Sequence, residues 1–358
     1  MRLRALVLVW ALSALACAPV LEGGVAARAP ELREDGWPVA TPDAMGIDAR
    51  ALAHLSEQLA STRKHGIDAV VIARRGHLVY EAYTRKGGRD ELHDLRSATK
   101  SITALLIGLA QARGKLAVDD LVNAHLPPEL ALAHAPTATL ADLLTMRSGL
   151  DCDDRNRRSP GQEERMYRTR DWVAFFAQLP AVAEPGERSA YCTGGLVALG
   201  EVLRAATGEA PDDFARDALF EPLGISEVEW AHFDGGRGVD TGGHLELRAR
   251  DFAKIGELVR RRGEWGGERI LPEAWIAEAT TAHTRVDGED YGYAWWLADL
   301  STPAGPIRVW YASGNGGQTL FVVPELELVV AFTGRNYNSP KARLPFQILA
   351  QVIVPAVQ

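Results

Sequence analysis

The chain has 358 residues, of which 47% are hydrophobic and 24% charged, and its formal net charge is -8. This composition is typical of a folded globular protein with one large core or two closely packed sub-domains, and it excludes a disordered chain. The negative balance and the absence of a basic stripe exclude a typical nucleic-acid-binding protein.

Residues 1–17 have the pattern of an export signal. Two arginines precede an apolar run that is too short to span a bilayer. The small residues ahead of Cys17 resemble a bacterial lipoprotein signal, so Cys17 is a candidate for lipidation; cleavage after Ala18, with free secretion, is the alternative. We expect a linker over residues 18–36 and an exported protein, either periplasmic or anchored to the membrane through this lipid alone.

In chain order, the sequence predicts a helix, a β-hairpin, a block of helices, and then strands mixed with helices. Apolar residues at helical or alternating spacing give these predictions. The predicted helices cover residues 48–63, 97–112, 139–147, 171–179, 194–207, 211–219, 250–262, 272–280 and 342–358. The predicted strands cover residues 69–72 and 78–80 in the hairpin, and then 293–297, 307–310, 320–323 and 328–332.

This order of elements favours an α+β fold, of the α/β sandwich kind. The early hairpin would join the late strands in one antiparallel sheet flanked by helices, and the block of helices would be an inserted all-helical sub-domain. We therefore assign residues 37–96 and 225–358 to an α/β domain and residues 97–224 to a helical sub-domain. A binding site is expected in the crevice between the two parts.

Ser97 and Lys100 form an S-x-x-K pattern at the start of an apolar helix. Residues three apart lie on one face of a helix, so the amine can reach the hydroxyl, and a buried lysine can act as the base that activates a serine. The alternative is an N-capping serine with a surface lysine. A second copy, from Ser61 to Lys64, lies at the end of a helix in a polar run, and we interpret it as solvated.

An ordered set of further motifs follows the S-x-x-K pattern. The motifs are LLTMRSGL at 143–150, PGERSAY at 185–191, FEPLGI at 220–225 and GNGGQ at 314–318. From about residue 40 to residue 355 the chain resembles the class C β-lactamase-like and penicillin-binding serine hydrolases, which include esterases and 6-aminohexanoate-oligomer hydrolases. The resemblance implies the β-lactamase/transpeptidase fold and an acyl-enzyme mechanism that uses no metal or organic cofactor.

The resemblance also implies roles for particular residues. Ser97 would be the nucleophile, Lys100 its base, and Tyr191, at the place of the family's Y-x-N motif, a proton relay. The backbone N–H groups of Ser97 and Asn315 would form the oxyanion hole. The residues that we expect along the substrate pocket are Thr193, Ser313, Gly314, Gln318, Tyr291 and Trp295, although the aromatic ones fit a sheet core equally well. Tyr337 precedes Asn and Ser but follows the last strand, and we set it aside.

Two departures from the family pattern bear on the substrate. Thr193 stands where the family has an asparagine, and Ala312 where it has a cationic lysine or histidine. Without that cation, recognition of a substrate carboxylate is weakened. We therefore predict a serine hydrolase for a small ester or amide. The alternatives are a peptidoglycan D-alanyl carboxypeptidase or β-lactamase, and a non-catalytic penicillin-binding sensor.

Two cysteines adjoin motifs that flank the cleft in the resembled fold. Cys152 follows the 148–150 turn and Cys192 follows Tyr191, so in an oxidising compartment a disulfide between them is a possible pairing. Two buried free thiols are the alternative. We interpret Asp153 and Asp154 as part of a solvated loop rather than a calcium site.

Overall fold

The computed structural model describes residues 29–61, 64–84 and 88–358. The predicted signal peptide, Cys17 and residues 18–28 of the predicted linker lie outside the described residues. Within the described ranges, no helix is long and apolar enough to cross a membrane.

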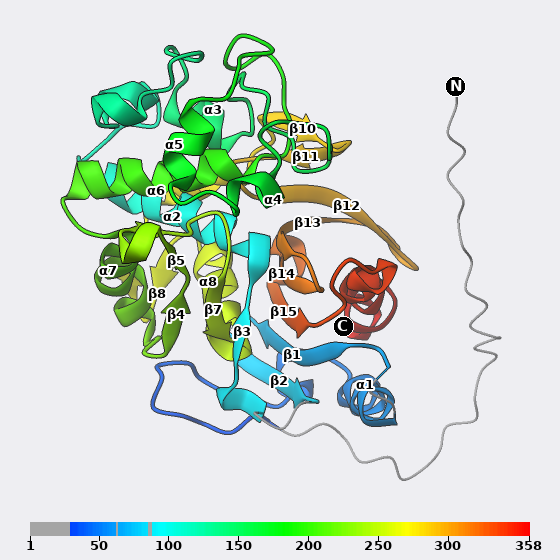
Figure 1. Ribbon diagram of the computed structural model, residues 1–358. Helices are drawn as coiled ribbons and strands as arrows, with labels where there is room; N and C mark the ends of the chain where they lie inside the picture. The colour runs from blue at the N-terminus through cyan, green and yellow to red at the C-terminus, as the bar shows by residue number, and fades with distance from the viewer. Residues whose placement is uncertain (1–28, 62–63, 85–87) are drawn as a thin grey trace.

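One eight-stranded sheet forms the centre of the molecule (Figure 1). Its strand order is β10-β11-β12-β13-β14-β15-β1-β2, and every neighbouring pair is antiparallel. The bounds are β1 Ile67–Arg74, β2 His77–Tyr83, β10 Thr284–Val286, β11 Glu289–Tyr291, β12 Trp296–Thr302, β13 Gly305–Gly314, β14 Gln318–Val323 and β15 Leu328–Gly334. The early hairpin therefore joins the late strands, as the order of elements predicts.

The middle strands are buried on both faces, which explains their continuous apolar sequences. Every residue of β1, β14 and β15 is buried. Helix α8 (Ala249–Arg260) covers one face, while α1 (Ala49–Ser61) and the C-terminal helices lie on the other (Figure 1). Those C-terminal helices are α10 (Leu344–Ile348), η11 (Leu349–Ile353) and α11 (Val354–Ala356).

The helical part packs beyond one end of the sheet (Figure 1). Its α-helices are α2 (Thr99–Ala112), α3 (Leu140–Leu144), α4 (Glu163–Met166), α5 (Trp172–Ala177), α6 (Thr193–Thr207) and α7 (Pro211–Ala215). Helix α2 is buried around almost its whole circumference, because it packs against α6 on one side and contacts β13 on another. It is therefore the element that connects the helices with the sheet.

Short strands and helices complete the chain. A three-stranded sheet has the order β3-β7-β4, and two hairpins pair β5 with β6 and β8 with β9. Their bounds are β3 Leu92–Asp94, β4 Val228–Trp230, β5 His232–Phe233, β6 Gly238–Val239, β7 Leu245–Arg248, β8 Glu264–Trp265 and β9 Glu268–Arg269. The remaining helices are α9 Glu273–Ala279, η1 Asp43–Met45, η2 Gly88–Asp90, η3 Arg96–Ala98, η4 Val122–Ala124, η5 Pro128–Leu130, η6 Arg216–Phe220, η7 Glu221–Leu223, η8 Asp234–Gly236, η9 Pro324–Leu326 and η10 Pro340–Arg343.

Two predicted elements differ from the structure, and residues with positive φ explain both differences. The strand predicted over 293–297 begins only at Trp296, because Ala294 has φ 54° and its N–H donates to the Leu144 carbonyl at 2.9 Å. The helix predicted over 139–147 ends at Leu144, shortly before Met146 with φ 61°. A non-glycine residue in this region cannot continue a regular strand or helix.

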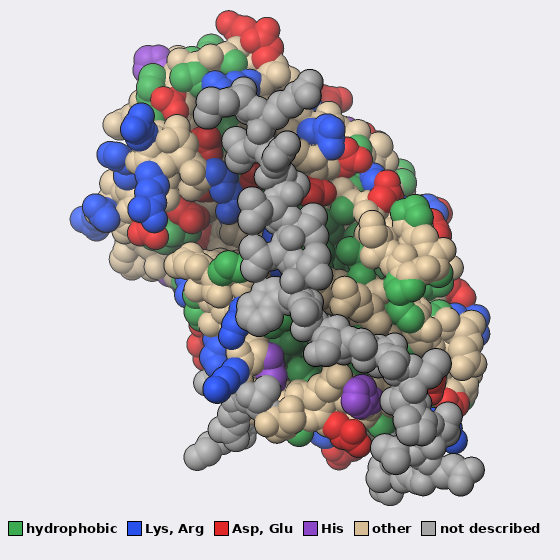
Figure 2. All heavy atoms as spheres, turned by 90° about the vertical axis from the view of Figure 1, so that its right-hand side faces the viewer, with side chains coloured by type: hydrophobic (Ala, Val, Ile, Leu, Met, Phe, Trp, Pro, Cys, Tyr) green, Lys and Arg blue, Asp and Glu red, His purple; other side chains and the backbone are tan. Residues whose placement is uncertain are grey.

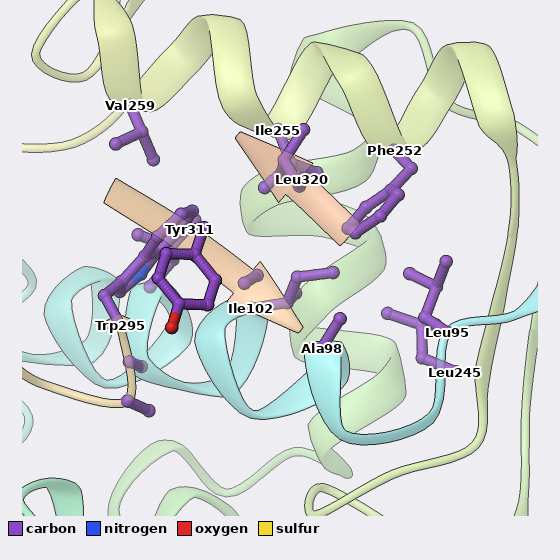
Figure 3. Packing of buried hydrophobic residues seen from close by; sticks show 14 of the residues in the cluster. Leu95, Ala98, Ile102, Leu245, Phe252, Ile255, Val259, Trp295, Tyr311 and Leu320 are labelled. Carbon is purple, nitrogen blue, oxygen red and sulfur yellow. The ribbon is translucent and has the colours of Figure 1, made fainter. Parts of the chain in front are cut away.

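The apolar core extends up to the start of α2. Ala98 and Ile102 point towards Leu320 of β14, with Phe252 and Ile255 of α8 beyond (Figure 3), and all five side chains are fully buried. Burial of a side chain of this size contributes about 1.5–3 kcal/mol. The packing therefore fixes the start of α2, which carries Lys100, and the turn with Ser97 that precedes it.

Charges of both signs cover the outer surface. Figure 2 shows Lys and Arg side chains gathered at the height of the helical part, with acidic side chains among them. Residues 155–170 contain six arginines, although the whole chain is acidic. Where the described side chains are visible on this face, basic and acidic groups are therefore interspersed.

Candidate active site

Ser97 lies in a sharp turn between a strand and a buried helix. The turn begins after β3, where Arg96 adopts φ 51° and its N–H donates to Asp94 Oδ1 at 2.8 Å. Ser97 then enters the short helix η3, which leads directly into α2. Ser97 is only partly buried, whereas Ala98 is fully buried. The hydroxyl is therefore presented at the end of a rigid helix, and the neighbouring backbone is strained.

The Lys100 amine meets the Ser97 hydroxyl inside the protein. Lys100 is 1% exposed, and its Nζ lies 3.1 Å from Ser97 Oγ. The same Nζ donates a hydrogen bond to the Gly242 carbonyl oxygen at 2.6 Å. A base must lie within hydrogen-bonding distance of the proton that it removes, and the Lys100 amine satisfies this condition.

A loop at residues 240–244 holds the carbonyl that binds Lys100. Asp240 is fully buried; its Oδ1 accepts from the Gly242 N–H at 3.2 Å, and its Oδ2 lies 2.6 Å from His244 Nδ1. Arg96 Nη1 lies 2.9 Å from His244 Nε2. A guanidinium can only donate, so Nε2 accepts and Nδ1–H donates to Asp240. The hydrogen bond to Asp240 raises the pKa of His244 above its ordinary value.

Sequence reasoning missed this loop. The sequence shows Asp240 and His244 on either side of two glycines, but nothing in it connects this group with Lys100.

Tyr191 completes the group at the end of α2. It is 5% exposed, and its ring centroid lies 5.2 Å from Lys100 Nζ. The ring stacks on Trp296 with a centroid distance of 5.6 Å, and the Arg155 guanidinium lies 4.8 Å from its centroid. The structure therefore brings Ser97, Lys100 and Tyr191 together, as the sequence predicts, and adds two side chains around the phenol.

The end of β13 lies against the turn that carries Ser97. A Cβ atom at Gly314 would stand 2.1 Å from the Leu95 carbonyl oxygen, so only glycine allows this approach. Asn315 follows directly, and its side chain exchanges hydrogen bonds of 3.0 and 2.9 Å with Asn338. This placement is compatible with an oxyanion hole formed by the N–H groups of Ser97 and Asn315, which stays a prediction.

Most of the other residues predicted along the substrate pocket are buried in the fold. Thr193, Gln318, Tyr291 and Trp295 are at most 1% exposed. The Thr193 hydroxyl donates to a carboxylate, and the Gln318 side chain pairs with the Gly334 backbone. The aromatic pair belongs to the hydrophobic core. The structure corrects the expectation that these four side chains face a substrate, and it leaves Ser313 half-buried on β13.

Tyr337 lies closer to the site than expected. Its ring centroid lies 5.0 Å from the Arg96 guanidinium, and a Cβ atom at Gly316 would stand 2.7 Å from the ring. Tyr337 is 42% exposed, and its ring contacts Arg96 rather than the lysine. It is therefore a surface residue next to the Ser97 turn and not part of the buried group.

Cys152 and Cys192 are joined by a disulfide, with 5.4 Å between their Cα atoms. Asp154, two residues later, is not the solvated side chain that we expected. Its carboxylate accepts hydrogen bonds from the backbone N–H groups of Thr193 at 2.7 Å and Glu163 at 2.9 Å. Burial, and then the charge of Glu163, raise the pKa of Asp154 to about 6. This half-buried carboxylate therefore lies beside Tyr191 and the start of α6.

A polar cavity of about 240 Å³ lies beside the disulfide. Its lining includes Asp151, Asn156 and Arg188, and none of the three predicted catalytic residues. Within the described ranges, no group of three or more His, Cys, Asp or Glu side chains is placed to hold a metal ion.

Comparison with curated proteins finds hydrolases. The chain is 34% identical over 206 residues to esterase EstB of Burkholderia gladioli, covering 52% of this chain and 52% of that protein. It is 24% identical over 326 residues to the 6-aminohexanoate-dimer hydrolase of Paenarthrobacter ureafaciens, covering 82% of this chain and 77% of that protein. The match to the esterase thus spans about half of its length.

Solved structures share the fold. EstCE1, described as a hydrolase with promiscuous acyltransferase activity, aligns with a TM-score of 0.67 at 20% identity, covering 83% of this chain and 97% of that chain. A penicillin-binding protein from Bacillus halodurans aligns with a TM-score of 0.66 at 17% identity, covering 82% of this chain and 99% of that chain. The family model described as Beta-lactamase matches residues 52–352. The chain therefore belongs to the beta-lactamase family.

Proposed function

We propose that the protein is a serine hydrolase that cleaves ester or amide bonds through an acyl-serine at Ser97. The observation that supports this proposal is the buried Lys100 amine, 3.1 Å from Ser97 Oγ and 5.2 Å from the centroid of the Tyr191 ring. A serine needs a base to become a nucleophile, and a phenol beside that base can transfer the proton onwards.

The reaction follows from these positions. Ser97 Oγ attacks the carbonyl carbon, and its proton passes to the Lys100 amine, which Gly242 keeps in place. The N–H groups of Ser97 and Asn315 stabilise the negative oxygen. The Tyr191 phenol passes the proton to the leaving group as its bond to the acyl carbon breaks. Water then attacks the acyl-serine by the reverse proton route and releases the acid.

The preferred substrate is a neutral acyl compound rather than a β-lactam. Ala312 is 1% exposed on β13 and offers no charge for a carboxylate. The Thr193 hydroxyl, at the place of the family's asparagine, is bonded to Asp154 at 2.8 Å. A site without a partner for a carboxylate does not compensate the desolvation of that group. Relatives in this family include a protein named as an esterase and one named as a 6-aminohexanoate-dimer hydrolase, which agrees with this preference.

The test compares a nitrophenyl ester with a chromogenic cephalosporin, on the full-length protein and on Ser97→Ala. We expect faster turnover of the ester and loss of both activities in the variant. Faster turnover of the cephalosporin would overturn the substrate class and favour a β-lactamase or D-alanyl carboxypeptidase. A protein labelled by neither a fluorophosphonate nor a fluorescent penicillin would overturn the enzyme and leave a non-catalytic sensor.

We also propose that the protein is exported and anchored through a lipid on Cys17. The signal-like composition of residues 1–17 supports this, and so does the Cys152–Cys192 disulfide, since disulfides persist outside the reducing cytosol. Metabolic labelling with a radioactive fatty acid tests it. We expect label in the wild-type protein and none in Cys17→Ala. Equal label in both, or an intracellular location, would overturn this proposal.

A further inference from the structure

We propose that Asp154 is a positioning residue for Tyr191: together with the neighbouring disulfide, it holds the Tyr191 main chain where the ring lies beside Lys100. This inference rests on the proposed function. It concerns a carboxylate that is near the reacting groups and contacts neither Ser97 nor the Lys100 amine through a hydrogen bond of its own.

Residues 152–155 are attached to Tyr191 and to the residue that follows it. The disulfide connects Cys152 to Cys192, the residue after Tyr191. The Asp154 N–H donates to the Tyr191 carbonyl oxygen at 2.8 Å. One covalent bond and one backbone hydrogen bond therefore fix two consecutive residues of the segment that carries the phenol.

The Asp154 side chain extends this attachment to the next residue. Its Oδ2 accepts from the Thr193 N–H at 2.7 Å and from the Thr193 hydroxyl at 2.8 Å. Thr193 is the first residue of α6, and the N-cap residue Cys192 makes no side-chain capping bond. Asp154 thus caps α6 from a distant segment, where a negative charge also interacts favourably with the helix dipole.

Arg155 holds the Tyr191 ring itself. Its guanidinium lies 4.8 Å from the ring centroid, and its Nε donates to Asp287 Oδ2 at 3.0 Å, between β10 and β11. A guanidinium over an aromatic face is attracted by the ring. The segment 152–155 therefore connects the phenol to the sheet side of the molecule as well as to α6.

Glu163 makes the arrangement depend on pH. Its Oε2 lies 3.1 Å from the Thr193 hydroxyl, which also bonds to Asp154. A hydroxyl has one proton and can donate to only one of the two carboxylates at a time, so the two acidic groups lie close enough for the charge of Glu163 to act on Asp154. Burial and the Glu163 charge raise the pKa of Asp154 to about 6, and Lys100 opposes this shift.

The charged and titratable groups that face Asp154 come from four segments. They are Glu163 of α4, Lys100 of α2, Tyr191 before α6, and the nearby Tyr167 and Arg155. Burial raises the pKa of Tyr167, which therefore stays neutral in the relevant range. When Asp154 is protonated, one oxygen carries a hydrogen and accepts less well, so kcat should fall as the pH drops through about 6.

The first test replaces Asp154 by Asn, with Asp119→Asn, at an exposed aspartate in the turn after α2, as the matched control. The amide NH₂ would face one of the N–H donors, so at least one hydrogen bond is lost. Displacing a proton-transfer group acts on the transition state, so we expect kcat for the nitrophenyl ester to fall about 10- to 100-fold while KM changes less than about threefold. Asp119→Asn should stay within about twofold of the wild type.

The second test separates positioning from a merely structural role through the pH profile of kcat, whose acid limb is the fall of kcat at low pH. Glu163→Gln removes a negative charge that raises the pKa of Asp154. The acid limb should therefore move to lower pH, with turnover retained. Glu164→Gln, an exposed neighbour in the same helix, should leave the limb in place. An unmoved limb in Glu163→Gln, or an equal movement in both variants, overturns the inference.

Fluorophosphonate labelling of wild-type Ser97 keeps the two proposals distinguishable. If the wild-type protein is not labelled, the proposed function fails. If it is labelled and Asp154→Asn retains full kcat at pH 8, only the positioning role fails. Near-ultraviolet circular dichroism and a count of free thiols check that Asp154→Asn folds with its disulfide; if it does not fold, the movement of the limb in Glu163→Gln decides.

Discussion

The chain contains the S-x-x-K pattern twice, and the two copies lie in opposite environments. Ser61 is the exposed last residue of α1, and its hydroxyl donates to the Gln58 carbonyl of its own helix at 2.8 Å. Ser97 precedes α2, and its hydroxyl meets the Lys100 amine, which is 1% exposed. Four letters at the same spacing therefore give a solvated helix end in one place and a desolvated pair in the other.

The difference shows that an S-x-x-K pattern can be reactive only where the surrounding structure buries its lysine. The apolar helix α2 buries Lys100, and the 240–244 loop supplies the carbonyl that holds its amine. A surface lysine is strongly hydrated and flexible, so it is a poor base and a poorly aimed one. An amine that is held in a buried site is neither strongly hydrated nor flexible.

The largest expected effect on kcat comes from removing the Ser97 hydroxyl, and removal of the Ser61 hydroxyl is the control. Ser97→Ala should lower kcat for the nitrophenyl ester by at least about 10⁴-fold, because the nucleophile is lost. Ser61→Ala should leave kcat unchanged. Steady-state kinetics on both purified variants check this, and a comparable loss in Ser61→Ala would contradict the comparison.

Replacing the buried amine should separate activity from stability. Lys100→Met keeps most of the side-chain volume and removes the base, so kcat should fall by about 10³-fold or more while the thermal midpoint does not fall. Lys64→Met, in the exposed copy, should leave kcat unchanged. Differential scanning calorimetry beside the kinetics measures both quantities, and wild-type turnover in Lys100→Met would show that another group takes the proton.

The disulfide should contribute mainly to stability. Cys152 and Cys192 are separated by 40 residues, so their cross-link restricts a long loop of the unfolded chain. The double variant Cys152→Ser/Cys192→Ser should lose about 2–4 kcal/mol of unfolding free energy, measured by denaturant titration. Mild reduction of the wild-type protein should give a similar loss, and no change in either experiment would mean that the bond is absent in solution.

The smallest effects, on stability alone, concern two glycines of α6. One of them, Gly200, packs against the 240–244 loop, and the other, Gly195, does not. A Cβ atom at Gly200 would stand 2.5 Å from Thr241 Oγ1, so Gly200→Ala should displace the loop and destabilise the fold by about 1–3 kcal/mol. A Cβ atom at Gly195 meets nothing closer than 3.7 Å, so Gly195→Ala should stabilise the helix by up to about 1 kcal/mol. Thermal unfolding of both variants checks the opposite signs.

Local patterns predicted the parts of the site that are local in sequence. The spacing of Ser97 and Lys100 on an apolar helix indicated their contact, and the alternating strands indicated the sheet. Gly242 is 142 residues from Lys100 in the sequence, and a periodic pattern of apolar residues cannot predict a contact over such a separation. Asp154 looked solvated because its sequence neighbours are polar, but folding against α6 half-buries it. Positive φ at Ala294 likewise depends on contacts with a distant helix end.

The most direct measurement is mass spectrometry of the protein trapped with a slowly hydrolysed ester or a fluorophosphonate. The account predicts one covalent adduct, on the peptide that contains Ser97, with none on the peptide that contains Ser61. In Lys100→Met the rate of adduct formation should fall by about 10³-fold. An adduct on any other residue, or labelling at the wild-type rate without Lys100, would contradict the claim that a buried amine activates Ser97.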